Sequence, residues 1–278
     1  MKLEKRTVLI TGGTSGIGLE LARQLHQRGN TVIVTGRDQG KLDAVKRELP
    51  GVHTFMSDVS DPLAIATLHD NVIAEFPELD TLINNAGIMR NLNLNQDRGL
   101  KDVTREIEIN LSGPVRMVQQ FLPHLKTRTG ALIVNVSSGL AFIPIPASPV
   151  YCATKAAIHS FTQSLRVQID GTGVTVVELA PPAVETPLLR AEFAEEMKGQ
   201  KGMDVKVLAR RAIAGIEAGK TEIRPGLSNV LKAMSRIAPQ FMLRQMVKMT
   251  KPKNPGLQSK GRLTSPQPAG DRHGEHER

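Results

Sequence analysis

The sequence TVLITGGTSGIG occupies residues 7–18, close to the start of the chain. Its first five residues are apolar or β-branched, which is typical of a buried strand. Four glycines follow, and an amphipathic helical pattern begins at Ile17. Glycines allow a tight turn and a close approach of backbone to a pyrophosphate, and the free N–H groups of a helix start attract that anion. The stretch therefore predicts a strand, a phosphate-binding turn and a helix.

The spacing of these glycines is G-x-x-x-G-x-G from Gly12 to Gly18. It differs from the G-x-G-x-x-G of the commoner dinucleotide-binding loops, and an ordinary turn between strand and helix is the alternative interpretation. The position after the first strand of an alternating series favours nucleotide binding. The loop residues predicted to bind the cofactor are Gly12, Thr14, Ser15, Gly16, Ile17 and Gly18.

Strand and helix patterns alternate beyond this loop. Short β-branched runs occupy residues 7–11, 31–35, 80–83, 131–136 and 174–179, and helical spacing of apolar residues occupies 17–28, 41–48, 61–75, 101–126 and 150–169. Such alternation predicts right-handed βαβ units. The predicted fold is α/β, a Rossmann-type doubly wound parallel sheet of about seven strands with helices on both faces.

The chain divides by composition into a single domain at residues 1–225 and a C-terminal extension. In the extension, Pro239 should separate two helices within residues 226–250, where one face is predicted to be apolar and buried. That face comprises Val230, Met234, Ile237, Phe241 and Met242. Residues 251–278 lack apolar periodicity and are expected to be a disordered basic tail.

The formal net charge is +9, and most of it lies in the extension. From Ser228 onward, ten basic residues face three acidic ones, so the domain itself is nearly neutral. We do not expect nucleic-acid binding, because the charge is spread along a terminus. The first interpretation is that the extension packs against the body or a second subunit, and the second is peripheral contact with a membrane.

Cysteine content and the N-terminus bear on compartment and metal. The single cysteine, Cys152, excludes an intrachain disulfide and a cysteine-rich zinc site. No apolar segment of signal-peptide length precedes the first glycines, and no run of eighteen apolar residues occurs. We therefore expect a cytoplasmic protein, with membrane association through the extension as the alternative, and no metal.

The end of the second strand reads TGRD at residues 35–38. In this type of fold, an acidic residue here binds the ribose hydroxyls, whereas an arginine accommodates a 2′-phosphate. Arg37 offers a planar guanidinium suited to phosphate oxygens. The sequence favours NADP(H) over NAD(H), although the adjacent Asp38 could reach the ribose, and both residues could be solvated loop charges.

The only tyrosine of the chain, Tyr151, stands four residues before Lys155 in a predicted helix. Side chains at this spacing share a helix face. An ammonium group stabilises a neighbouring phenolate and lowers the pKa of the phenol, so that tyrosine can serve as an acid or base. Such a pair is common on helix surfaces, but here it lies thirteen residues after Ser138.

Several separated motifs follow one another along the chain, namely TGGTSGIG, Asp58-Val59 after the third strand, NNAG at 84–87, Asn110, Ser137-Ser138, and Tyr151 with Lys155. Together they resemble the short-chain dehydrogenase/reductase family over nearly all of residues 5–225. Within that family, the TGGTSGIG loop, the Pro-Pro segment at 181–182 and the extension resemble the bacterial DltE-like oxidoreductases.

The resemblance implies four catalytic residues. Tyr151 would donate or accept the substrate proton, and Ser138 would hydrogen-bond the substrate oxygen. Lys155 would lower the pKa of Tyr151 and bind the nicotinamide ribose, and Asn110 would hold a water that connects Lys155 to solvent. A turn and a helix kink are the alternative interpretations of Asn84-Asn85 and Asn110.

The remaining cofactor contacts also follow from the resemblance. Asp58 and Val59 would bind the adenine, Asn85, Ala86 and Gly87 would pass close to the ribose, and Val184 with Thr186 would meet the carboxamide. Pro182 departs from the family, which usually has glycine there, so this loop should be stiffer. Residues 187–203 would form a lid over a largely apolar pocket that includes Leu140, Phe142, Ile143, Ile145, Leu188, Leu189 and Phe193. These seven residues could equally belong to the core.

Taken together, the sequence predicts an oxidoreductase that transfers a hydride between NADP(H) and a carbonyl or alcohol carbon of a small, apolar substrate. The alternative is a catalytically silent NADP(H)-sensing regulator or scaffold. The intact set of Tyr151, Lys155, Ser138 and Asn110 favours catalysis. The resemblance also implies a homodimer or homotetramer formed through residues 101–126 and 150–169.

Overall fold

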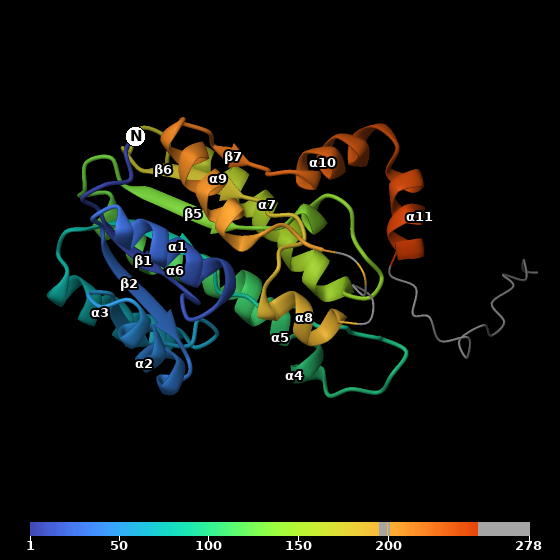
Figure 1. Ribbon diagram of the computed structural model, residues 1–278, viewed down its shortest axis with the longest axis horizontal. Helices are drawn as coiled ribbons and strands as arrows, with labels where there is room; N and C mark the ends of the chain where they lie inside the picture. The colour runs from blue at the N-terminus through green and yellow to red at the C-terminus, as the bar shows by residue number, and fades with distance from the viewer. Residues whose placement is uncertain (195–198, 200, 250–278) are drawn as a thin grey trace, which may run out of the picture.

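A computed structural model describes residues 1–194, 199 and 201–249 and shows a seven-stranded parallel sheet (Figure 1). The strand order is β3-β2-β1-β4-β5-β6-β7, and every neighbouring pair runs parallel. The predicted fold class is confirmed. The strands are β1 (Thr7–Ile10), β2 (Thr31–Gly36), β3 (His53–Met56), β4 (Leu79–Asn84), β5 (Leu132–Val136), β6 (Thr175–Leu179) and β7 (Glu222–Ile223).

Helices cover both faces of the sheet, and each layer encloses its own apolar core. On one face lie α1 (Gly16–Gln27), α2 (Gln39–Glu48) and α9 (Val205–Glu217), of which α1 and α9 are in front in Figure 1. On the other face lie α3 (Pro62–Glu75), α6 (Gly113–Leu125) and α7 (Pro149–Gln168). This arrangement confirms the two helical layers that the alternating pattern predicts.

The strand order reverses between β1 and β4, which opens a crevice at the carboxyl ends of these strands. The chain leaves β1 at Thr11, whose N–H donates to Ile83 O of β4 at 3.0 Å. The Thr11 hydroxyl accepts hydrogen bonds from the N–H groups of Asn85 and Ala86 at 3.0 and 3.1 Å. The glycine loop and the NNAG segment are thereby fixed side by side at the edge where ligands bind in such folds.

The predicted helix at residues 101–126 is not continuous, and this prediction is wrong in detail. The structure has short turns α4 (Leu100–Val103) and α5 (Arg105–Ile107), a π-helical segment (Glu108–Ser112) and then α6. A π segment inserts a residue into the helical ladder and is frequent at functional sites. It contains Asn110, whose side chain bonds the backbone of another segment instead of facing solvent.

The extension forms two helices, as Pro239 predicts: α10 (Leu227–Ile237) and α11 (Pro239–Met249). Val230, Ile237 and Phe241 of the predicted apolar face are exposed and do not pack against the body, whereas Ser228 and Leu231 of α10 are buried. Burial of that face against a second subunit stays a prediction. Apolar residues occur on more than one side of α10, and its fit to the body decides which side packs. We call α10 and α11, residues 227–249, the C-terminal hairpin.

None of the described helices has the length and apolarity that a membrane span requires. Contact of the hairpin with a membrane surface stays a prediction. The predicted tail at 251–278 lies outside the described residues.

Candidate active site

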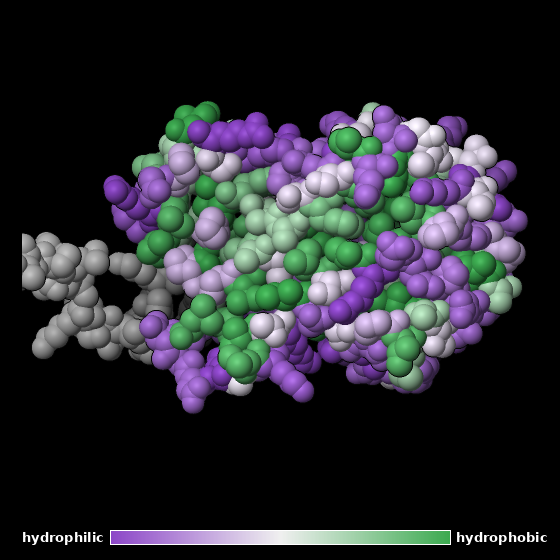
Figure 2. All heavy atoms as spheres, turned by 180° about the vertical axis from the view of Figure 1, so that it is seen from behind, coloured by the Kyte–Doolittle hydropathy of each residue, from purple (hydrophilic) through white to green (hydrophobic). Residues whose placement is uncertain are grey.

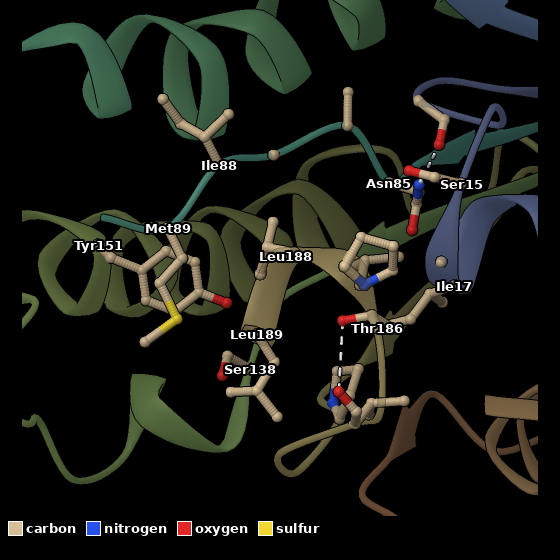
Figure 3. Close-up of a pocket in the computed structure, with 18 of the residues that line it drawn as sticks. Ser15, Ile17, Asn85, Ile88, Met89, Ser138, Tyr151, Thr186, Leu188 and Leu189 are labelled. Carbon is tan, nitrogen blue, oxygen red and sulfur yellow. Dashed lines mark hydrogen bonds between the residues drawn. The ribbon is translucent and has the colours of Figure 1, made fainter. Parts of the chain in front are cut away.

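A cavity of about 870 Å³ lies at the carboxyl edge of the sheet and gathers most of the predicted site residues. Figure 3 shows its inner part, where Tyr151 and Ser138 face the same space as Leu188 and Leu189. The predicted residues that line it are Gly12, Thr14, Ser15, Gly16, Ile17, Arg37, Asp58, Val59, Asn85, Ala86, Gly87, Ser138, Tyr151, Lys155, Val184 and Thr186. Gly18 and Asn110 do not line it.

The glycine loop is shaped by close backbone contacts. Gly12 has a φ of +65°, and a Cβ there would lie 2.8 Å from Ala86 Cα. Gly16 has a φ of +54°. A side chain at Gly18 would collide with the Gly12 carbonyl and the Asn85 amide, so this glycine shapes the loop from behind without touching the cavity. The glycines thus leave the backbone of the turn open at the start of α1, which fits a pyrophosphate.

Charged groups gather at one end of the cavity. Arg37 and Lys41 line it there together with Asp38 and Asp58. The Asp38 carboxylate accepts a hydrogen bond from the Lys41 N–H at 3.1 Å and caps the start of α2. This cap holds Asp38 at the start of α2, where it still lines the cavity together with Arg37. Lys41 was not predicted, although a lysine in the first turn after Asp38 was a visible signal.

Asp58 lies opposite Arg37 at the same end. One carboxylate oxygen accepts from the Ser60 N–H at 2.9 Å and its hydroxyl at 2.7 Å, and the other is 3.5 Å from Arg37 Nη1. Although partial burial acts in the opposite direction, the hydrogen bonds from Ser60 and the charge of Arg37 lower the pKa of Asp58. Asp58 is therefore held as a carboxylate that can accept hydrogen bonds.

Tyr151 and Lys155 project from the first turns of α7 towards the end of β5. Lys155 Nζ donates to Val136 O at 2.9 Å and lies 5.6 Å from the centre of the Tyr151 ring. Burial lowers the pKa of Lys155 to about 8. Burial also raises the pKa of Tyr151 well above its usual value of 10, while the Ser138 side chain lowers it. Tyr151 is thus a protonated phenol at neutral pH.

Asn110 lies behind Gly87, on the side away from the cavity. Its amide oxygen accepts from the Ile88 N–H, and its amide nitrogen donates to Ile88 O, both at 2.9 Å. A Cβ on Gly87 would lie 3.2 Å from the Asn110 amide oxygen and 3.6 Å from Lys155 Nζ. The π segment therefore brings Asn110 close to Lys155. Through its hydrogen bonds to Ile88, Asn110 also holds the end of the NNAG segment against the π segment.

The other end of the cavity is apolar. Five of the predicted pocket residues line it, namely Leu140, Ile145, Leu188, Leu189 and Phe193. Phe142 and Ile143 do not: Phe142 packs against the His159 ring and the Lys232 ammonium group, and Ile143 is buried elsewhere. The pocket prediction is wrong for these two residues, which follow the 3₁₀ turn after Ser138, and the alternative of a core position holds for Ile143.

The sequence analysis missed four further apolar residues of this end: Met89, Leu227, Leu231 and Met246. Met89 follows the NNAG segment and lies beside Tyr151 in Figure 3. The other three belong to the C-terminal hairpin, and no local motif signals that an extension returns to the site.

The loop after β6 closes the cavity between its two ends. Pro181 and Pro182 both line it. The Thr186 hydroxyl donates to Val184 O at 3.2 Å, and Val184 forms an isolated bridge with Met203. These contacts fix the loop although glycine is replaced by Pro182. The expected lid at 187–203 includes α8 (Pro187–Phe193), and residues 195–198 and 200 of it lie outside the described residues.

Comparison with known proteins identifies the family. The short chain dehydrogenase family matches residues 6–197. The chain belongs to this family. It is 42% identical over 226 residues to an uncharacterized oxidoreductase, DltE, of Bacillus subtilis (strain 168). The aligned region covers 80% of this chain and 89% of that protein. The DltE-like resemblance of the sequence is thereby confirmed, and the chain is an NAD(P)-dependent oxidoreductase of the short-chain dehydrogenase kind.

Solved structures agree with this assignment. A short-chain dehydrogenase from Sphingobium yanoikuyae in complex with NADPH superposes with a TM-score of 0.74 at 26% identity, over 85% of this chain and 95% of that one. A 3-ketoacyl-(acyl-carrier-protein) reductase from Brucella melitensis complexed with NADH gives 0.73 at 27% identity, over 82% and 100%. Structures with NADPH and with NADH therefore both occur among similar folds. The preference of this chain for one of the two cofactors depends on the end of the cavity that Arg37 lines.

Proposed function

We propose that the protein transfers a hydride between NADP(H) and the carbonyl or alcohol carbon of a small, apolar substrate. The observation that carries this proposal is the single cavity region in which Tyr151, Lys155 and Ser138 face apolar side chains at one end and Arg37 stands at the other. When bound, the cofactor supplies or accepts the hydride. The glycine turn at 12–16, Asn85 to Gly87, Val184 and Thr186 would hold it along the cavity.

The proton chemistry belongs to the chain itself. Tyr151 is a protonated phenol and can donate to an oxygen that gains negative charge as the carbonyl is reduced. The Ser138 hydroxyl can hydrogen-bond the same oxygen, which is preorganised electrostatic stabilisation. Lys155, fixed by Val136 O beside Tyr151, provides the positive charge that favours the phenolate left behind. Asn110 lies near both Gly87 and Lys155 and would hold the water that reconnects Lys155 to solvent.

The substrate class follows from the apolar end. None of the residues named there carries a charge, and a charged group placed against them would lose its hydration without a partner; Lys201 is a charged residue elsewhere in the cavity lining. An uncharged aldehyde, ketone or alcohol with a hydrocarbon portion fits this surface.

The test is a panel of uncharged aldehydes and ketones, with NADPH consumption followed by absorbance. Turnover of one or more apolar carbonyl compounds supports the proposal. Binding of NADPH without turnover of any compound would favour the alternative, a protein that senses NADP(H) without catalysis.

Arg37→Ala is expected to raise the Kd for NADPH by about tenfold or more and to change the Kd for NADH less than twofold. The physical reason is the loss of charge-assisted hydrogen bonds to the 2′-phosphate, typically about 1.5–3 kcal/mol. Titration of the protein with each cofactor measures both constants. Lys46→Ala, on the exposed side of α2, is the matched control and should change neither. Equal affinity of the wild type for NADPH and NADH would contradict the cofactor assignment.

We further propose that the protein assembles as a homodimer or homotetramer through α6 and α7. Val115 of α6 and Val167 of α7 are exposed, and α7 also presents the small residues Ala153, Ala156 and Ser160 to solvent. Figure 2, the side opposite to α1 and α9, shows apolar side chains in a band between polar flanks. Such contiguous apolar surface is typical of subunit interfaces.

Light scattering is expected to give two or four times the 30.2 kDa of one chain. Val167→Glu should lower this mass, because a charge would be buried between subunits. Leu63→Glu, on the exposed side of α3, should not. A wild-type mass of one chain would contradict the proposed assembly.

A further inference from the structure

The C-terminal hairpin is seated beside the catalytic serine. Ser228 and Leu231 of α10 pack on Gly139, the residue after Ser138. A Cβ on Gly139 would lie 2.8 Å from Ser228 Oγ and 3.1 Å from Leu231 Cδ1, so the contact requires a glycine at this position. The Gly139 N–H donates to Pro181 O at 2.7 Å, which ties the same point to the loop after β6. The hairpin therefore rests on the backbone that holds Ser138.

A salt bridge fixes the hairpin in this position. Lys232 Nζ donates to both carboxylate oxygens of Glu222 on β7, at 2.5 and 2.6 Å, and lies 5.4 Å from the centre of the Phe142 ring. Arg224 also contacts Glu222, at 2.7 Å. The side chain of Lys232 is 15% exposed, so this pair is shielded better than a surface ion pair. The contact of Lys232 with Phe142 joins segments far apart in the sequence, and the pair with Glu222 holds α10 against β7.

The inner side of the hairpin is part of the cavity wall. Leu227 and Leu231, one turn apart on α10, and Met246 of α11 line the same cavity as Tyr151 and Ser138. Met246 also packs against the cluster formed by Met89, Ile145, Tyr151, Cys152 and Phe193. Both helices of the hairpin thus reach the substrate end of the site.

The basic residues of the hairpin do not lie on the side that lines the cavity. Its sequence contains no acidic residue, and its basic residues Lys232, Arg236, Arg244 and Lys248 are absent from the cavity lining. What the hairpin offers to the cavity is two leucines and a methionine, which favour hydrocarbon over polar groups.

We propose that the C-terminal hairpin recognises the hydrocarbon portion of the substrate, and that Leu231 and Met246 determine which hydrocarbon portions the enzyme accepts. The proposal rests on the carbonyl reductase or alcohol dehydrogenase activity proposed above. It extends that activity by assigning substrate selection to residues outside the part of the chain that the family match covers.

A tryptophan reporter tests the wall without turnover. The chain contains no tryptophan, so Leu227→Trp on the inner side and Ile237→Trp on the outer side each carry a single one. Both leucine and isoleucine are more than half exposed, at 54% and 78%, so either substitution should be tolerated. Both variants also carry Tyr151→Phe, so that the bound alcohol is not oxidised during the titration. Both are saturated with NADP⁺ beforehand.

Titration with 2-decanol is expected to shift the emission of the inner reporter saturably and to leave the outer reporter unchanged. With 2-octanol, the half-saturation concentration should rise about tenfold, because two methylenes fewer are buried. Equal shifts at both reporters, or no saturable shift at the inner one, would overturn the proposal. This result is independent of the carbonyl panel, because the fluorescence measurement requires no reaction.

Leu231→Ala supplies the kinetic test. The ratio of kcat/KM for 2-decanone to that for 2-butanone is expected to fall about tenfold, with the change in KM rather than kcat. Ile237→Ala, on the outer side, should leave the ratio unchanged. An equal loss for both ketones would mean that Leu231 only supports the fold, and would overturn its role in selection.

Discussion

Tyr151→Phe is expected to lower kcat by roughly 10³-fold, within the range typical of a lost general acid or base. The substitution removes one oxygen from a buried ring and leaves its packing with Met89, Ile145 and Phe193 in place. Because burial keeps the Tyr151 phenol protonated, the wild-type enzyme holds a proton that the proposed reduction would consume. Phenylalanine has no proton to give, and Ser138 alone cannot replace an acid positioned on the substrate oxygen.

The measurement that isolates this effect is kcat together with the Kd for NADPH. The Kd should change less than threefold, since the phenol is one of many residues along the cavity. Cys152→Ala is a matched control: Cys152 is buried in the same cluster but does not line the cavity, so its loss perturbs packing and spares chemistry. Near-normal turnover by Tyr151→Phe would show that another group carries the proton.

The fold was predictable because its signals are local. The β-branched run at 7–11 forms β1. Gly12 follows it, and a glycine is required there because the backbone lies too close to Ala86 for a Cβ. The β-branched runs missed two strands, and the family resemblance alone placed one of them before Asp58. β3 is only partly buried, and its histidine and threonine interrupt the apolar run, while β7 has two residues and begins with the ion-paired Glu222. Neither strand carries the periodicity that identifies a buried strand.

The candidate site was predictable where a motif fixes both residue type and spacing, as for Tyr151 and Lys155 on successive turns of α7. It was not predictable where tertiary contact decides. Leu231 reaches the cavity because Gly139 permits α10 to approach, while Ile237 on the same helix remains exposed. The two residues are equally apolar, so composition and periodicity cannot separate them. Long-range packing, which here links Gly139 to Leu231, 92 positions later in the sequence, carries the missing information.

Lys155→Met is expected to abolish most activity and yet stabilise the protein without cofactor. Lys155 is 5% exposed, and its ammonium donates to a neutral carbonyl, Val136 O. Burial lowers the pKa of Lys155 from 10.5 to about 8. At neutral pH the folded protein therefore holds a charge that would be more stable in water. Methionine has a similar shape without the charge, so it relieves this cost but removes the group that favours the phenolate of Tyr151.

The size and sign follow from the pKa. A shift in the pKa of Lys155 from 10.5 to about 8 means that the charged side chain costs the folded state roughly 3 kcal/mol. Methionine removes this cost but also removes the hydrogen bond to Val136 O, which contributes about 1 kcal/mol. Below pH 8 both folded and unfolded states keep the Lys155 proton, and the wild type bears the full cost. Between pH 8 and 10.5 the folded state releases that proton, so the cost declines. The unfolding free energy of Lys155→Met should exceed that of wild type by about 2 kcal/mol at pH 7, and less at pH 10.

Thermal unfolding at pH 7 and pH 10 measures this difference, which corresponds to a rise in Tm of roughly 4–8 °C at pH 7. Lys155→Arg is the matched control, because arginine keeps its charge throughout this range and should destabilise the fold at both pH values. Loss of stability in Lys155→Met at pH 7 would mean that the ammonium is well compensated in the folded protein. The expected pairing, lower kcat/KM with higher Tm, instead identifies Lys155 as a residue kept at the expense of stability because the proton transfer by Tyr151 requires its charge.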